Sequence, residues 1–151
     1  LIAASLELGG IAAGGNATQL AALRDYGQAL GLAFQITDDL LDYTADETTT
    51  GKPSGLDLHE HKVTLPLIYA IPRLSPVERA ELEALMRDPT PSDDAIASVV
   101  ASVRAHGGLD YARDRAQRLI LEAEEELALL PDTPARDILR ASLGYVLERR
   151  R

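Results

Sequence analysis

The stretch ATQLAALRDYGQALGLAFQITDDLLDY, residues 17–43, decides the fold of this 151-residue chain. It contains no proline, and its apolar side chains recur at the three- and four-residue spacing of one face of an α-helix. These positions are Leu20, Leu23, Leu30, Ala33, Ile36, Leu40 and Leu41. The pattern therefore predicts one long helix that ends at about Tyr43.

Further helices are predicted on both sides of this stretch. Residues 1–13 are apolar and helical in character, and Asn16 is a suitable N-cap for the long helix. Ser75, followed by Pro76 and Glu78, is a typical helix start. No segment has the alternating pattern of a strand, so we expect an all-α fold in one domain. Proline and glycine clusters divide the rest of the chain into predicted helices at residues 63–72, 76–87, 92–105, 109–130 and 135–149.

Composition excludes several classes of function. The formal net charge of −9 argues against a nucleic-acid partner, because phosphate backbones are bound by basic surfaces. Cysteine is absent, which excludes disulfides, zinc–thiolate sites and cysteine nucleophiles. No apolar run approaches the length of a transmembrane helix, and the first residues do not resemble a secretory signal. We therefore expect a cytoplasmic location.

The end of the long helix carries the clearest chemical signal. At about 100° per residue, Gln35, Asp38, Asp39 and Asp42 fall within an arc of about 100° on one helix face. Three carboxylates this close repel one another, so we expect a cation to offset them. Mg²⁺ suits this position, because it binds through one or two carboxylates together with water and substrate phosphates. A solvated acidic face without a ligand is the alternative interpretation.

The segment after the long helix favours a phosphate ligand. Residues 44–61 lack helical periodicity and are read as a long loop, of the kind that usually has a function. Lys52 and Lys62 match phosphate oxygens, and the glycines at 51 and 55 let the backbone approach closely. An ordinary surface role is the alternative for either lysine alone.

Together these residues resemble the second aspartate-rich region of the trans-isoprenyl diphosphate synthases, the polyprenyl synthetase family. The likeness rests on GLAFQITDDLLDY at residues 31–43, then on Gly51-Lys52-Pro53, Asp57 and Lys62-Val63-Thr64-Leu65-Pro66. It implies a helical bundle of the isoprenoid-synthase type. It also implies a prenyltransferase that joins isopentenyl diphosphate head-to-tail to an allylic prenyl diphosphate, with Mg²⁺ as cofactor.

The resemblance implies a metal site built from three acids and supported by a fourth. Asp38 and Asp42 would face one Mg²⁺, and Asp39 would support them or orient bound water. Asp57 would orient a metal-bound water or a lysine without touching the metal itself.

It also implies contacts with the substrates. Lys52 would bind the allylic diphosphate, and Lys62 is a weaker candidate for the same task. Gln35 would lie close to the reacting atoms as a catalytic residue, with Phe34 beside it.

The likeness covers residues 1–151 but only the C-terminal half of a family member. The N-terminal half, with its own aspartate-rich motif, is needed to complete the site, so we expect the chain alone to be inactive. We expect a homodimer in the intact protein, because small residues allow close helix approach. These residues are Ala3, Ala4, Gly9, Ala12 and Ala13.

Two other functions share much of this pattern. A class I terpene cyclase would use a similar fold and ionisation, but its second site usually contains an Asn-Ser/Thr-Glu arrangement. A non-catalytic helical subunit of a two-component synthase would tend to lose the acidic motif. This chain keeps Asp38-Asp39-Leu40-Leu41-Asp42, which favours the synthase.

Overall fold

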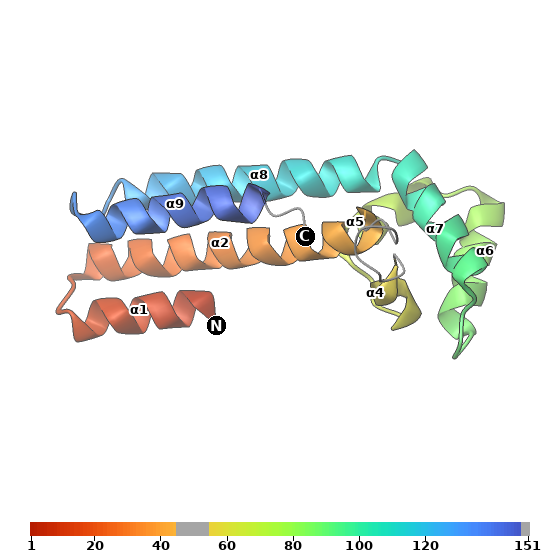
Figure 1. Cartoon of the computed structure of the whole chain (residues 1–151), viewed down its shortest axis with the longest axis horizontal. Helices are drawn as coiled ribbons and strands as arrows, with labels where there is room; N and C mark the ends of the chain where they lie inside the picture. The colour runs from red at the N-terminus through yellow and green to blue at the C-terminus, as the bar shows by residue number, and fades with distance from the viewer. Residues whose placement is uncertain (45–54, 149–151) are drawn as a thin grey trace. The chain divides into compact units, whose positions relative to one another are not determined.

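The computed structural model describes residues 1–44 and 55–148 of the chain (Figure 1). Every regular element in these ranges is helical, so the expected all-α class is confirmed. None of these helices combines the length and the apolar character that crossing a membrane requires. The elements are α1 (Ile2–Ala12), α2 (Ala17–Thr44), α4 (Leu56–His59), α5 (Leu65–Ala70), the 3₁₀ helix η1 (Ile71–Arg73), α6 (Pro76–Arg87), α7 (Asp93–Ala105), α8 (Gly108–Leu127) and α9 (Pro134–Glu148).

Local capping explains why most predicted helix starts are confirmed. The Asn16 side chain accepts a hydrogen bond from the backbone N–H of Gln19, and the Gln19 side chain accepts one from Asn16 N–H, both at 3.0 Å. Ser75 and Glu78 form the same reciprocal pair at the start of α6. Each pair satisfies N–H groups that have no partner within the helix.

Three predicted boundaries are wrong. The segment predicted as a loop through residue 61 contains one helical turn, α4. The next helix begins at Leu65 instead of residue 63, because its N-cap Thr64 is extended. Finally, α8 ends at Leu127, three residues before Leu130, where the chain turns.

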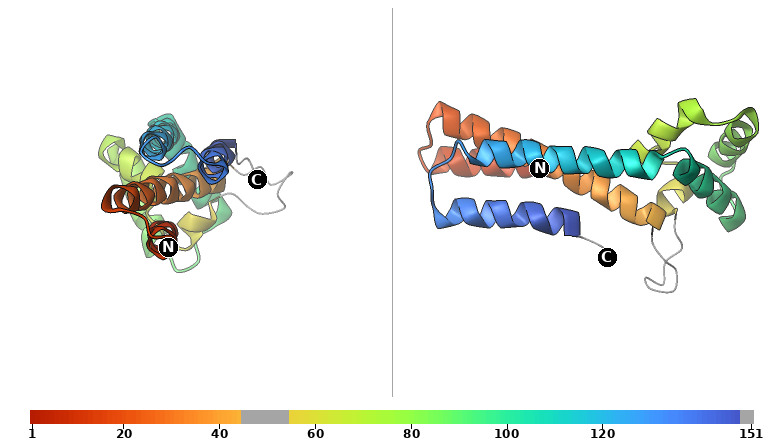
Figure 2. Two further views of the ribbon diagram at one scale, coloured as in Figure 1. Left: turned by 90° about the vertical axis from the view of Figure 1, so that its left-hand side faces the viewer. Right: turned by 90° about the horizontal axis from the view of Figure 1, so that it is seen from above.

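The chain divides into two compact units, and residues 1–37 with 114–148 form the first. Here α1 lies alongside the first part of α2, and α8 and α9 form an antiparallel pair (Figures 1 and 2). A Cβ added to Gly27 on α2 would lie 2.7 Å from the Cα of Ala3 on α1, so the two backbones are in direct contact. Ala3 is therefore partly covered by α2, whereas the other small residues proposed for an interface are not. Ala4, Gly9, Ala12 and Ala13 are exposed.

The second unit comprises Asp38–Arg113. Its helices are short apart from α6 and α7, which pack against each other, and α7 also packs against α5. Two-residue proline breaks at Asp88-Pro89 and Thr90-Pro91 separate α6 from α7. The core is a cluster of large apolar side chains: Tyr43, Leu58, Leu67, Ala70, Leu74, Leu82, Leu85, Ile96, Val99, Val100, Val103 and Leu109. Tyr43 and Leu58 join this core from the end of α2 and from α4, which fixes the two segments that carry the site.

Candidate functional site

The acids of the predicted metal site lie on the last turns of α2. Asp38, Asp39 and Asp42 are all partly buried, and Tyr43, next in sequence, is almost fully buried. The buried tyrosine fixes the rotation of the helix end, and the acids border its buried face, in agreement with their partial burial. The predicted acidic face is thus part of a rigid element.

Asp42 holds the beginning of α4. Its carboxylate oxygens accept hydrogen bonds from two consecutive backbone N–H groups, Oδ1 from Leu56 and Oδ2 from Asp57, both at 3.0 Å. Its carbonyl oxygen accepts a third bond, also 3.0 Å, from the N–H of Gly55. Three successive residues of the chain are therefore fastened to one aspartate.

Gly55 allows this arrangement. Its φ of +85° lies in the left-handed region, which glycine adopts without strain. A Cβ at this position would lie 2.4 Å from the Cγ2 of Ile96, so there is also no space for a side chain. The sequence predicted that the backbone at Gly55 approaches another group closely. In the structure, that group is Ile96 in the protein core.

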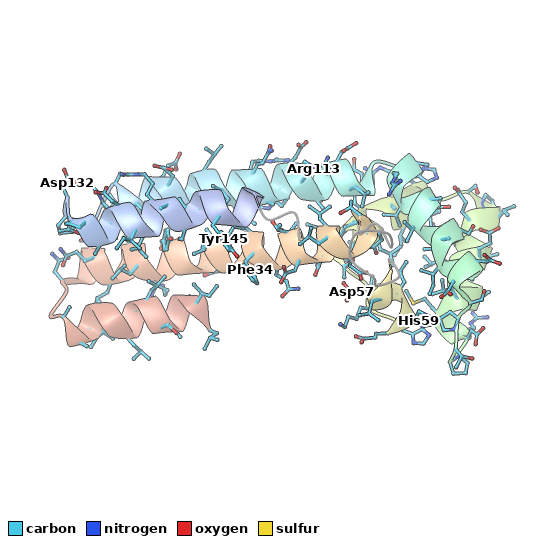
Figure 3. All side chains as sticks on the ribbon, in the orientation of Figure 1. Phe34, Asp57, His59, Arg113, Asp132 and Tyr145 are labelled. Atoms are coloured by element: carbon cyan, nitrogen blue, oxygen red, sulfur yellow. The ribbon has the colours of Figure 1, made fainter. Side chains whose placement is uncertain are left out.

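Asp57 and Lys62 form an ion pair across α4 and the turn that follows. The ammonium of Lys62 lies 3.1 Å from Asp57 Oδ1 and 2.6 Å from Glu60 Oε2. The backbone N–H of Lys62 also donates to the carbonyl of Asp57 at 2.8 Å. Figure 3 labels Asp57 on α4. The two carboxylates engage two of the three donors of the ammonium group, although the Lys62 side chain is 55% exposed.

The charge environment follows from burial and these contacts. Burial raises the pKa of the Asp42 carboxyl, and the nearby Asp57 carboxylate raises it further, whereas the N–H groups of Asp57 and Leu56 lower it. Burial also raises the pKa of Tyr43 to about 12. Hydrogen bonds to Glu60 and then Asp57 raise the pKa of Lys62, which keeps it a cation.

Tyr43 adds a further link in this region. Its hydroxyl accepts a hydrogen bond from the Thr64 hydroxyl at 3.2 Å, and its carbonyl accepts one from Arg104 at 3.5 Å. The Tyr43–Thr64 bond ties the residue before α5 to the end of α2. Both sides of the α4 segment are therefore attached to the same helix.

The structure brings together part of the predicted site. Asp42, Asp57 and Lys62 are linked by direct contacts, and Asp38 and Asp39 precede Asp42 on the same helix. Lys52 lies outside the described residues. On α2, one helical turn before the acids, Gln35 is exposed and Phe34 is partly buried (Figure 3).

The donor set suits a hard cation that is shared with a phosphate ligand. In the described ranges, no group of three His, Asp or Glu side chains is arranged to hold a metal ion by itself. His59 and His61 instead contact Asp93 at 3.7 Å and the Asp88 carbonyl at 2.7 Å. Mg²⁺ needs only one or two carboxylates when phosphates and water complete its coordination, so the acidic face fits it.

Two contacts in the site were not predicted from the sequence. Glu60 pairs with Lys62, and its position two residues before the lysine is the only local signal for that contact. The anchoring of α4 by Asp42 joins residues 14 and 15 positions apart, across residues that have no periodic pattern. Neither contact follows from helical spacing.

The chain is similar to known prenyl diphosphate synthases over nearly all of its length. A family profile described as polyprenyl synthetase matches residues 1–103. The short chain isoprenyl diphosphate synthase of Methanothermobacter thermautotrophicus is 38% identical over 149 residues, which are 99% of this chain and 45% of that protein. The octaprenyl diphosphate synthase of Escherichia coli is 37% identical over 151 residues, 46% of its length.

Solved structures agree with this similarity. A decaprenyl diphosphate synthase from Rhodobacter capsulatus has a TM-score of 0.84 and 39% identity, and covers 99% of this chain and 45% of its own. A polyprenyl synthase from Caulobacter crescentus, complexed with calcium and isoprenyl diphosphate, has a TM-score of 0.87 and 35% identity. The match covers 99% of this chain and 46% of the Caulobacter chain. The chain thus spans about half the length of the relatives that it matches, and it belongs to the polyprenyl synthetase family.

Proposed function

We propose that the chain is the C-terminal half of a polyprenyl synthetase domain and that the complete protein is a polyprenyl diphosphate synthase. It would condense isopentenyl diphosphate with an allylic diphosphate, head-to-tail, to give a longer polyprenyl diphosphate. The observation that carries this proposal is the acidic face of α2, to which Asp42 ties the Asp57–Lys62 pair. Family membership supports the same reaction.

In this reaction the allylic C–O bond breaks and its electron pair leaves with the diphosphate. The double bond of isopentenyl diphosphate attacks the allylic carbon, and a proton is lost. Bound Mg²⁺ supplies positive charge that stabilises the departing diphosphate. Asp38, Asp39 and Asp42 form the face that holds the ion in this proposal.

The remaining residues of the site bind and position the substrate. Lys62 would donate to a diphosphate oxygen from the side chain that Asp57 and Glu60 hold in place. Lys52 is proposed for the same diphosphate. Gln35 and Phe34 would line the allylic chain one helical turn before the acids, with the amide near the reacting carbon.

The proposed partners are the two diphosphate substrates, the N-terminal half of the domain and a second copy of the protein. Exposed apolar side chains on α1, Leu8 and Ile11, support a homodimer. One relative at 34% identity is named heptaprenyl diphosphate synthase component 2, from Geobacillus stearothermophilus, so a hetero-oligomer is the competing assembly. Sedimentation of the intact protein as a monomer at micromolar concentration would contradict both. The composition supports a cytoplasmic location and no nucleic-acid partner.

Asp38→Asn in the complete synthase tests the proposed function. This variant keeps the size of the side chain and removes its charge. Inorganic pyrophosphate is the probe. With Mg²⁺ present and pyrophosphate at about a hundred times its dissociation constant, the free energy of unfolding of the wild type should rise by about 2.7 kcal/mol. The variant should lose most of this Mg²⁺-dependent shift, and its turnover should fall at least about 100-fold, or about 2.7 kcal/mol in activation free energy.

Asp25→Asn is the matched control. Asp25 lies on the same helix, is exposed, and accepts a hydrogen bond from Arg24 at 3.2 Å. The control should keep the thermal shift and the turnover of the wild type. If Asp38→Asn keeps the full Mg²⁺-dependent shift, the acids form only a solvated face and the proposal fails.

A further inference from the structure

We propose that Asp42 is a positioning residue: it acts at the site by fastening α4 to the end of α2, and not by binding the metal directly. This inference rests on the proposed function, because it concerns how the Asp57–Lys62 pair is placed for a diphosphate. It reassigns one of the three acids that the sequence predicts as metal ligands. Asp38 and Asp39 keep that role.

Both carboxylate oxygens of Asp42 already have backbone donors. Oδ1 accepts from Leu56 and Oδ2 from Asp57, each at 3.0 Å. This is the arrangement by which an N-cap side chain satisfies the first N–H groups of a helix. A cation bound directly by Asp42 would share at least one oxygen with an N–H group whose positive end points at the same atom.

The helix α4 cannot supply its own cap. Its N-cap residue is Gly55, which has no side chain and makes no capping bond. A serine or aspartate cannot replace it, because a Cβ there would lie 2.4 Å from Ile96 Cγ2, and because φ is +85°. The cap must therefore come from elsewhere in the chain, and Asp42 provides it.

The helix α4 carries Asp57, which in turn contacts Lys62. Asp57 is the second residue of α4, and its own N–H is one of the two groups that Asp42 holds. Its carboxylate contacts the ammonium of Lys62, and its carbonyl accepts from Lys62 N–H. A displacement of the Asp42 carboxylate would thus move Asp57 first and Lys62 with it. Asp42 sets the position of a cation without touching the ligand.

Amide hydrogen exchange on the complete synthase without Mg²⁺ tests the anchor itself. Asp42→Asn replaces one acceptor oxygen by an amide NH₂, which cannot accept from an N–H. Exchange should become at least about tenfold faster than in the wild type at Leu56 or Asp57, whichever amide loses its acceptor. Asp38→Asn should leave exchange at these two amides unchanged. Unchanged exchange in Asp42→Asn would overturn the inference.

The dependence of turnover on Mg²⁺ separates positioning from ligation. Asp38→Asn should raise the Mg²⁺ concentration for half-maximal turnover at least tenfold, whereas Asp42→Asn should raise it less than threefold and instead raise KM for the allylic diphosphate. An increase in the Mg²⁺ requirement equal to that of Asp38→Asn would show direct ligation and overturn the inference. If Asp38→Asn itself has no effect on the Mg²⁺ requirement, the proposed function fails, and the exchange result still decides whether Asp42 is the anchor.

Lys62→Gln tests whether Asp42 has a purely structural role, and Asp42→Glu replaces Asp42→Asn if that variant does not fold. If Asp42 acts through Lys62, the KM effects of Asp42→Asn and Lys62→Gln should be non-additive, and full additivity would contradict the inference. Asp42→Glu keeps the charge but moves the carboxylate by one methylene. It should also accelerate exchange at Leu56 and Asp57, because the displaced carboxylate no longer meets both N–H groups. This variant keeps the inference testable if Asp42→Asn does not fold.

Discussion

The two units of this chain are held together in different ways. In the first, long helices pack through small residues: the buried side chains of α2 and α8 include Ala22, Ala29, Ala33, Ala116 and Ala123. In the second, short helices surround a cluster of leucines and valines, and hydrogen bonds between separate elements fix their ends. The first unit is therefore sensitive to added volume, and the second to the loss of individual polar contacts.

This difference in packing parallels the distribution of the candidate site residues along the chain. Close backbone contacts between long helices produce a rigid scaffold that tolerates few changes in shape. The acidic face and the Asp57–Lys62 pair lie in the second unit, where Asp42 and Tyr43 each make bonds to other segments. A site that depends on the placement of a few charges is thus built from contacts that can be removed one at a time.

The largest expected effect is that of Gly27→Ala in the first unit. The new Cβ would lie 2.7 Å from Ala3 Cα and 3.0 Å from Ala3 N, and these backbone atoms cannot move without displacing α1. We expect a loss of about 3 kcal/mol in the free energy of unfolding, measured by chemical denaturation. Gly144→Ala on α9 is the control, because nothing lies within 4 Å of its added Cβ. The control should be neutral or stabilising, by about 0.5–1 kcal/mol. Equal effects of the two variants would refute the description of the first unit.

Gly55→Ala should have the next largest effect, and it should be local to the second unit. The methyl group would meet Ile96 Cγ2 at 2.4 Å, and alanine at a φ of +85° is strained. Together these should reduce the free energy of unfolding by about 2 kcal/mol. Ile96→Val should restore little stability, because valine keeps the γ-methyl group that the new Cβ would meet and loses only Cδ1. A neutral Gly55→Ala would mean that α4 is free to shift, which contradicts its anchoring to α2.

Tyr26→Phe tests a polar contact in the first unit, where volume is expected to matter most. The fully buried Tyr26 hydroxyl donates to the Leu139 carbonyl at 2.8 Å and contacts the Ser142 hydroxyl at 2.8 Å. Removing it should cost about 1 kcal/mol, the usual value for one buried hydrogen bond. The matched variant in the second unit is Tyr43→Phe, which loses the 3.2 Å contact with Thr64. A loss for Tyr26→Phe as large as that for Gly27→Ala would show that hydrogen bonding dominates both units.

The sequence predicted the elements whose determinants are local. Asn16, Ser75 and the spacing of the acids on α2 each act within one or two helical turns, so their patterns are legible in the sequence. The turn of α4 was not predicted, because its cap comes from Asp42, 14 residues before Leu56. The pairing of Lys62 with Glu60 was missed for a similar reason, since it depends on the path of the turn after α4 and not on periodicity. The acids were thus predicted as a group, but the hydrogen bonds from Asp42 to Leu56 and Asp57 were not.

The smallest expected effect concerns the cap of α6 and depends on pH. The Ser75 backbone N–H donates to the Glu78 carboxylate at 2.7 Å, and His106 Nε2 lies 3.0 Å from the same group. These contacts, first among them the Ser75 N–H, lower the pKa of Glu78 to about 2. A carboxyl whose pKa is lower in the folded state contributes stability above its unfolded pKa, and this contribution is lost as the pH falls through the folded value.

Glu78→Gln should therefore destabilise the chain most above about pH 4.5, and the difference from the wild type should disappear near pH 2. Denaturation curves recorded across this range measure the difference directly. Glu83→Gln on the same helix is the control, because Glu83 contacts the Arg87 side chain at 3.3 Å and caps no helix. The effect of Glu78→Gln should exceed that of the control only where the carboxylate is ionised. A constant difference from pH 2 to pH 7 would mean that the glutamate stabilises α6 by packing, and the second unit would then depend less on single polar contacts than its structure indicates.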